Sequence, residues 1–143
     1  MKNRTHGERH DEWTTPTWLY EQLSYEFGPF TLDAAATAEN AKCGRFLTKD
    51  EDGLIAPWTG NVWCNPPYGR GVGKWAEKAM QEARAGNASA TLLLPASTDT
   101  VWFHDYCLGH GFVKFLRDRI RFNGADRAPF GSMVVVFRKR PKR

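Results

Sequence analysis

The chain has 143 residues, of which 41% are hydrophobic and 25% are charged. This length is enough for one domain with a buried core, and the composition excludes a disordered or fibrous chain. The formal net charge of +4 favours an acidic partner, because basic side chains that neutralise phosphates release condensed counterions.

Charge and hydropathy divide the chain into three parts. Residues 1–10 are polar and basic, and we expect them to form a flexible arm. Residues 11–138 are expected to form the folded domain, and residues 139–143 a basic tail that could contact phosphates. Since no early apolar stretch and no run of bilayer length is present, we expect a cytoplasmic protein that does not contact membranes.

Cysteine usage gives no sign of a cross-linked or metal-dependent fold. Cys43, Cys64 and Cys107 form no CxxC pair and are odd in number. The sequence therefore predicts neither a disulfide framework nor a metal site.

Helix and strand patterns alternate along the folded part. A helix is expected over 15–27, because Thr15 can cap it, Pro16 suits its first turn, and glycine and proline follow it at positions 28 and 29. A second helix is predicted at 72–85, with an inward face made of Trp75, Ala76, Ala79, Met80 and Ala83, and a third helix at 100–108. Strands are predicted at 30–33, 45–48, 61–64, 90–94, 113–116 and 133–138. This order indicates a single α/β domain with a largely parallel sheet and an antiparallel C-terminal edge strand.

Polar residues follow the predicted strands at the points where ligands bind in such folds. Asp33 ends the first strand and Asn65 follows a later one. Because ligands of parallel α/β sheets bind at the carboxyl ends of the strands, we expect both residues on one rim. The free N–H groups at the start of the Thr15-Pro16 helix would add an anion site to this rim.

The segment Asn65-Pro66-Pro67-Tyr68 carries the most direct prediction of chemistry. Two consecutive prolines fix φ and remove two backbone donors, so the strand must end in a rigid turn. The Asn65 side-chain oxygen and the Pro66 carbonyl can accept hydrogen bonds from an amino group on a planar ring, and Tyr68 can stack on that ring. The alternative is a strand-ending turn with Tyr68 packed in the core.

Taken in order, several segments resemble the small DNA N6-adenine methyltransferases (Dam-like) of bacteriophages and prophages. The resemblance covers nearly everything from residue 11 to residue 138. The segments that carry it are Trp13-Thr14-Thr15-Pro16, Phe30-Thr31-Leu32-Asp33-Ala34-Ala35-Ala36, Asn40-Ala41-Lys42-Cys43, Asp52-Gly53-Leu54, Val62-Trp63-Cys64-Asn65-Pro66-Pro67-Tyr68, Leu94-Pro95-Ala96 and Pro129-Phe130-Gly131-Ser132. It implies a Rossmann-like domain that transfers a methyl group from S-adenosylmethionine to the N6 amino group of adenine in double-stranded DNA.

The resemblance also implies residues that bind the cofactor. Thr15 would contact the methionine carboxylate of the cofactor, and Asp52 would accept a hydrogen bond from the amino group of the cofactor's own adenine. Asp33 would contact other polar groups of the cofactor. The small side chains of Ala34 and Ala35 would allow the backbone to approach the cofactor.

Each of these cofactor roles has a simpler structural alternative. Asp33 could cap the segment that follows it, Asp52 could form a turn with its own side chain, and Thr15 could cap a helix. The chain lacks a Gly-x-Gly loop after the first strand and an obvious ribose-binding acid, so Glu39 and Asp50 both remain candidates for the ribose.

For the reaction itself, the resemblance implies a catalytic corner made of Asn65, Pro66, Pro67 and Tyr68. The target base would be flipped out of the duplex and stacked on Tyr68. Phe130 could cover the opposite face of the base, with a core role as the alternative. Methylation at cytosine C5 is disfavoured, because no Pro-Cys pair is present to supply the nucleophile.

Arginines near the C-terminus are the candidates for DNA contacts. Arg117, Arg119, Arg121 and Arg127 lie in one predicted loop, and we expect Arg119 and Arg121 to bind substrate. Other interpretations remain open: methylation of RNA adenine or of a protein glutamine amide, or a catalytically inactive DNA-binding relative. The protein could act as a monomer or a homodimer, and the target sequence is not predicted.

Overall fold

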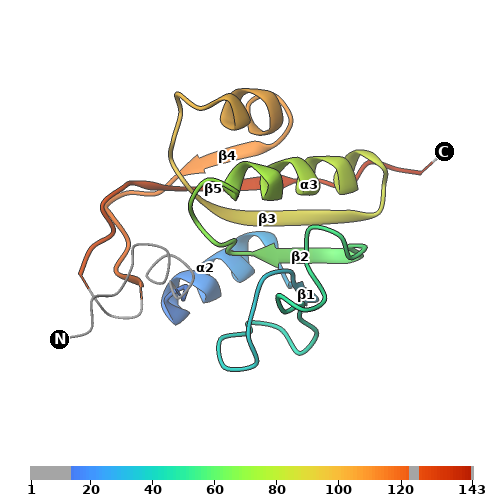
Figure 1. The fold of residues 1–143 in the computed structure, drawn as a ribbon, viewed down its shortest axis with the longest axis horizontal. Coiled ribbons are helices and arrows are strands. Elements are labelled where there is room, and N and C mark those ends of the chain that lie inside the picture. Colours follow the sequence, from blue (N-terminus) through green and yellow to red (C-terminus); the bar gives the residue numbers. More distant parts are fainter. Residues whose placement is uncertain (1–13, 123–125, 143) are drawn as a thin grey trace.

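The computed structural model describes residues 14–122 and 126–142, so the N-terminal arm predicted at residues 1–10 lies outside the described residues. Its elements combine helices and strands as expected for an α/β fold, although β1 is followed directly by β2 and β4 by β5 (Figure 1). In chain order they are helix α2 (Thr17–Phe27), strands β1 (Leu32–Asp33) and β2 (Gly60–Cys64), helix α3 (Val72–Arg84), strand β3 (Ala88–Pro95), π-helix η1 (Phe103–Cys107) and strands β4 (Phe112–Phe115) and β5 (Ser132–Phe137).

The strands form one five-stranded sheet in the order β1-β2-β3-β5-β4. β1, β2 and β3 pair in parallel, whereas β5 is antiparallel to both β3 and β4. The sheet is therefore mixed, with two parallel and two antiparallel pairs, where we expected a largely parallel one.

The C-terminal strand is antiparallel as predicted, but its predicted place at the sheet edge is wrong. β5 lies between β3 and β4, and β4 forms the edge. All six residues of β5 are buried, whereas none of the four residues of β4 is. The continuous apolar run from Met133 to Phe137 suits a strand with neighbours on both sides and cover on both faces.

Helix α2 begins later than expected. Pro16 is the N-cap residue, and no side chain caps the helix, so the predicted capping role of Thr15 is wrong. Leu19 and Leu23 are its buried residues and anchor it in the core. Gly28 follows as the C-cap, in agreement with the predicted end of the helix.

Helix α3 confirms the predicted inward face and holds the loop that precedes β2. The predicted inward residues are all buried: Trp75, Ala76, Ala79, Met80 and Ala83. The backbone N–H of Trp58 donates to Glu82 of α3 at 2.9 Å, and the Trp58 indole donates to the Gly53 carbonyl at 2.8 Å. These bonds fix the loop of residues 48–58 beside the sheet.

Two predicted elements are shorter than expected. The segment 45–48 forms only an isolated parallel bridge between Phe46 and Asp33, and the predicted helix over 100–108 is mainly the π-helix η1. None of the helices in the described part of the chain has the length and apolar character that a bilayer crossing requires.

Candidate active site

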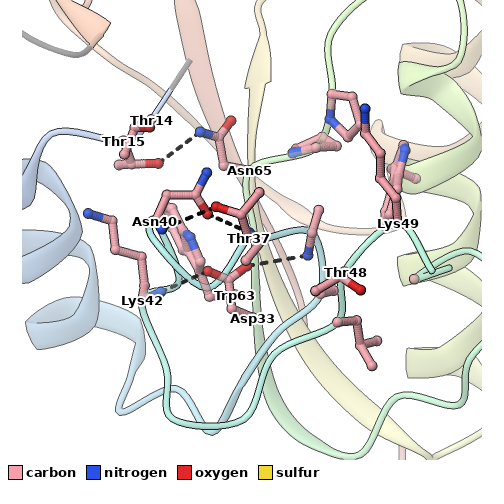
Figure 2. A pocket seen from close by; sticks show the side chains of 18 of the residues that line it. Thr14, Thr15, Asp33, Thr37, Asn40, Lys42, Thr48, Lys49, Trp63 and Asn65 are labelled. Atoms are coloured by element: carbon pink, nitrogen blue, oxygen red, sulfur yellow. Dashed lines mark hydrogen bonds between the residues drawn. The ribbon is translucent and has the colours of Figure 1, made fainter. Parts of the chain in front are cut away.

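A cavity of about 290 Å³ opens beside the carboxyl ends of β1 and β2 (Figure 2). This confirms that Asp33 and Asn65 share one rim, as the order of strands and polar residues indicated. The described residues that line it are Thr14, Thr15, Asp33, Ala34, Ala35, Ala36, Thr37, Asn40, Lys42, Leu47, Thr48, Lys49, Asp52, Gly53, Trp63, Asn65, Pro66, Pro67 and Trp75.

Asp33 places a buried carboxylate in the cavity wall. Its side chain accepts hydrogen bonds from the backbone N–H groups of Ala35 at 3.3 Å and Lys42 at 3.0 Å, so it does organise the segment that follows it. Burial raises its pKa to about 6, and the two backbone donors partly oppose that rise. At neutral pH most of the population is therefore ionised and can attract a cationic ligand.

Small residues after Asp33 bring the backbone to the cavity. The backbone N–H of Ala34 donates to the Trp63 carbonyl at 3.0 Å, and that of Ala36 donates to the Leu47 carbonyl at 3.0 Å. Gly53 approaches from the neighbouring loop so closely that a Cβ at this position would lie 2.2 Å from the Ala34 carbonyl oxygen. Only a glycine allows this contact between the two sides of the site.

Asp52 combines the two roles that the sequence left open. Its φ is 55°, and its side chain accepts a hydrogen bond from the Leu54 N–H at 3.0 Å, so the turn is confirmed. The same residue also lines the cavity. Binding of a ligand amino group by Asp52 is thus compatible with the turn and stays a prediction.

Asn65 and Thr15 meet across the site although 50 residues separate them in the sequence. The Asn65 Nδ2 group donates to the Thr15 hydroxyl oxygen at 2.9 Å (Figure 2). Thr15 is 3% exposed, and Asn65 is half-buried. The neighbouring Pro66 and Pro67 also line the cavity.

Tyr68 and Phe130 do not belong to the described lining of the cavity. Tyr68 is 7% exposed and donates its hydroxyl to the Leu93 carbonyl at 3.1 Å. Phe122 and Phe130 contact its ring edge-on, with centroid distances of 6.0 and 5.4 Å. In this structure Tyr68 thus takes the core position of the alternative interpretation, and stacking on a base requires its ring to leave that position.

Two lysines also line the cavity, and no role was predicted for either of them. Lys42 and Lys49 lie on different sides of the cavity (Figure 2). The backbone of Lys42 is bound to Asp33, and its ammonium group lies 5.8 Å from the centre of the Tyr20 ring. The signal for Lys42 was its place in the segment Asn40-Ala41-Lys42-Cys43, whereas nothing local distinguished Lys49 from a surface lysine.

Neither candidate for ribose binding lies at the cavity. Glu39 and Asp50 are exposed, and the carboxylates among the described lining residues are those of Asp33 and Asp52. Residues 14–122 and 126–142 contain no group of three or more His, Cys, Asp or Glu side chains that could hold a metal ion.

The predicted arginines lie at the same end of the sheet as the cavity. Residues 116–122 and 126–131 are the described parts of the loop between β4 and β5. The backbone N–H of Leu116 donates to the Ser132 carbonyl at 3.0 Å, and Ser132 pairs with Pro95 at the carboxyl end of β3. Arg119 and Arg121 in this loop are both exposed. We call this segment the arginine loop.

The basic tail lies at the opposite end of the sheet. The Lys139 N–H donates to the Ser89 hydroxyl at 2.8 Å, and the Arg140 N–H donates to the Ala83 carbonyl at 2.9 Å. Both partners lie near the start of β3, away from the carboxyl ends of the parallel strands (Figure 1). The arginine loop therefore lies at the same end of the sheet as the cavity, whereas the tail does not.

The chain matches the family model described as DNA N-6-adenine-methyltransferase (Dam) over residues 2–142. It is 37% identical over 95 residues to the DNA N-6-adenine-methyltransferase of Escherichia phage T1, a match that covers 65% of this chain and 39% of the relative. It is 31% identical over 125 residues to the DNA N-6-adenine-methyltransferase of Haemophilus phage HP1, covering 85% of this chain and 71% of the relative. The chain thus spans well under half of the T1 protein.

Proposed function

Because the chain belongs to the DNA N-6-adenine-methyltransferase family, we propose that it transfers a methyl group from S-adenosylmethionine to the N6 amino group of adenine in double-stranded DNA. One observation carries the proposal beyond family membership. A single cavity joins the Asn-Pro-Pro corner at Asn65 to the carboxylate of Asp33 and the small residues after it. This shared cavity supports the proposal, because the residues proposed for the acceptor and those proposed for the methyl donor are adjacent.

The cavity suits the cofactor in size and in chemistry. Its volume of about 290 Å³ is close to the lower end, about 300 Å³, of the range for small-molecule sites. Asp33 and Asp52 supply carboxylates for amino and hydroxyl groups, and Thr15 and Lys42 can bind a carboxylate. When bound there, S-adenosylmethionine would supply a methyl group activated by its positively charged sulfur.

Asn65 and Pro66 would prepare the acceptor. The exocyclic nitrogen of adenine is a weak nucleophile, because its lone pair is delocalised into the ring. Two hydrogen bonds, accepted by the Asn65 side-chain oxygen and the Pro66 carbonyl, would draw this nitrogen toward tetrahedral geometry and make its lone pair available. Most of the rate gain would come from placement and from fixed dipoles, so no strong base is required.

The target adenine has to leave the duplex to reach this corner. Tyr68 is proposed to stack on the flipped base, with Phe130 at the opposite face. Both rings pack against one another in the present structure, with centroids 5.4 Å apart. Base entry therefore includes a rearrangement in which Tyr68 gives up its contact with Leu93.

The arginine loop is proposed to hold the duplex over the cavity. Arg119 and Arg121 are exposed at the correct end of the sheet, where they can reach phosphates or base edges. We also propose that the fold is Rossmann-like. Three successive parallel strands with a cavity at their carboxyl ends are typical of methyltransferases with that fold.

The choice of acceptor is tested directly. Purified protein is incubated with cofactor carrying a labelled methyl group and with duplex DNA, RNA or a glutamine-containing protein substrate. We expect label in DNA, recovered as N6-methyladenine after digestion to nucleosides. If only RNA or only protein is labelled, that molecule is the substrate and the proposed one is wrong. If none of the three is labelled, the protein is an inactive DNA-binding relative.

A further inference from the structure

The hydrogen bond between Asn65 and Thr15 gives Thr15 a second task, beyond any contact with the cofactor. Thr15 precedes α2 and does not cap it, yet its side chain is buried and points at the Asn-Pro-Pro corner (Figure 2). Its hydroxyl oxygen lies 2.9 Å from Asn65 Nδ2. The bond therefore ties the chain before α2 to the residue proposed to accept from adenine.

The chemistry of a side-chain amide makes this contact important. The oxygen and the nitrogen of Asn65 are bonded to the same planar carbon, so holding the nitrogen decides where the oxygen points. A half turn of the amide would present N–H groups to the amino group of adenine, and two donors would then face each other. We propose that Thr15 is a positioning residue, which holds Asn65 Nδ2 so that the amide oxygen is available to the reacting nitrogen.

A hydroxyl can either donate or accept, so Thr15 alone does not decide the orientation of the amide. It must accept from Asn65 once its own hydrogen is donated elsewhere. A cofactor carboxylate beside Thr15, which forms part of the proposed function on which this inference rests, is such an acceptor. Bound cofactor would then select the productive orientation of Asn65 through Thr15.

Two substitutions separate positioning from simple cofactor binding. Thr15→Val keeps the shape of the side chain and removes the hydroxyl, whereas Thr15→Ser keeps the hydroxyl. With cofactor and DNA both saturating, we expect Thr15→Val to lower kcat roughly 10- to 100-fold, because misplacement of a reacting group has effects of this size. Thr15→Ser should stay within about 3-fold of the wild type, since a retained hydroxyl keeps the bond. A Thr15→Val enzyme with wild-type kcat and a raised KM for the cofactor alone would overturn the positioning role.

A measurement on the unmodified protein keeps the inference testable whether or not the variants fold or the wild type is active. In NMR spectra, we expect cross-relaxation between the Asn65 side-chain NH2 protons and the Thr15 side chain, and slow exchange of those protons with water when S-adenosylmethionine is added. A rapidly exchanging NH2 group without contact to Thr15 would refute the inference. If the wild type methylates no DNA, the proposed function fails, while this spectrum still decides the orientation of Asn65.

Discussion

The Tyr68 hydroxyl donates to the backbone carbonyl of Leu93 at 3.1 Å, which anchors the last residue of the Asn-Pro-Pro-Tyr segment in the core. Leu93 lies in β3, next to the strand that leads into the corner. The ring is therefore held away from the cavity by a buried hydrogen bond and by Phe122 and Phe130. Removing the bond and removing the ring should have different consequences.

Tyr68→Phe should destabilise the protein by about 1 to 2 kcal/mol, because it leaves the buried Leu93 carbonyl without this donor. Its ring remains, so binding of a flipped base should be preserved. Tyr68→Ala should cost about 3 to 5 kcal/mol in the free energy of unfolding and weaken binding of DNA with an unpaired target adenine by about 1 to 3 kcal/mol. Urea unfolding and binding titrations measure the two effects. Equal DNA affinity of the Ala and Phe variants would argue against stacking.

Asn65→Ala should abolish detectable methyl transfer while leaving cofactor affinity nearly unchanged. The substitution removes the amide oxygen proposed to accept from adenine, whereas Asp33 and Asp52 remain in the cavity wall. Calorimetric titration with S-adenosylmethionine and a transfer assay with labelled cofactor provide the two readouts. Retention of most of the activity would contradict the proposed role of Asn65.

Asp33 should make the wild type less stable as the pH rises from about 4 to above 6. Burial raises the pKa of this carboxyl from 3.8 to about 6, so between these values the folded state keeps a proton that the unfolded state has lost. The loss of stability through this window should reach up to about 3 kcal/mol, as follows from about 1.4 kcal/mol for each pKa unit. Asp33→Asn has no such group. Urea unfolding of both proteins at pH 4 and pH 7 should show the difference, and parallel pH profiles would refute it.

Gly53→Ala should disturb the site from the side of the Asp52 turn. An added Cβ would lie 2.2 Å from the Ala34 carbonyl oxygen and 2.7 Å from the Trp75 ring, so the loop must move. We expect a loss of about 1 to 3 kcal/mol of stability and weaker cofactor binding. Gly44→Ala is a matched control, because its Cβ would have nothing within 4 Å. Similar effects of the two substitutions would show that the close approach is unimportant.

The double substitution of Arg119 and Arg121 by Ala should weaken DNA binding and reduce its salt dependence. If each arginine neutralises one phosphate, the slope of log affinity against log salt should fall by about 0.9 for each of them. Substituting Lys139 and Arg140 by Ala removes the same charge from the opposite end of the sheet and serves as the control. DNA affinities are measured at several salt concentrations. Both the affinity and its salt dependence should differ from the wild type only in the variant of the arginine loop. A larger effect of the tail substitutions would place the DNA elsewhere.

Local patterns in the sequence were sufficient to predict the α/β class, the inward face of α3 and the position of Asp33 and Asn65 on one rim of the sheet. Each of these depends on periodicity, or on the rule that ligands bind at the carboxyl ends of parallel strands. The family resemblance, which rests on motifs in a fixed order, is likewise a property of the sequence and was confirmed by the family match.

Only the tertiary structure decided which of several possible partners each side chain has. It placed β5 inside the sheet rather than at its edge, because strand order depends on contacts between distant segments. In the structure Thr15 contacts Asn65 and does not cap the helix, and Tyr68 contacts Leu93 and does not line the cavity. The basic tail lies beside the start of β3. The sequence shows which kinds of group a hydroxyl, an aromatic ring or a charged side chain is able to bind. Its actual partner depends on which groups folding brings within about 3 Å of it.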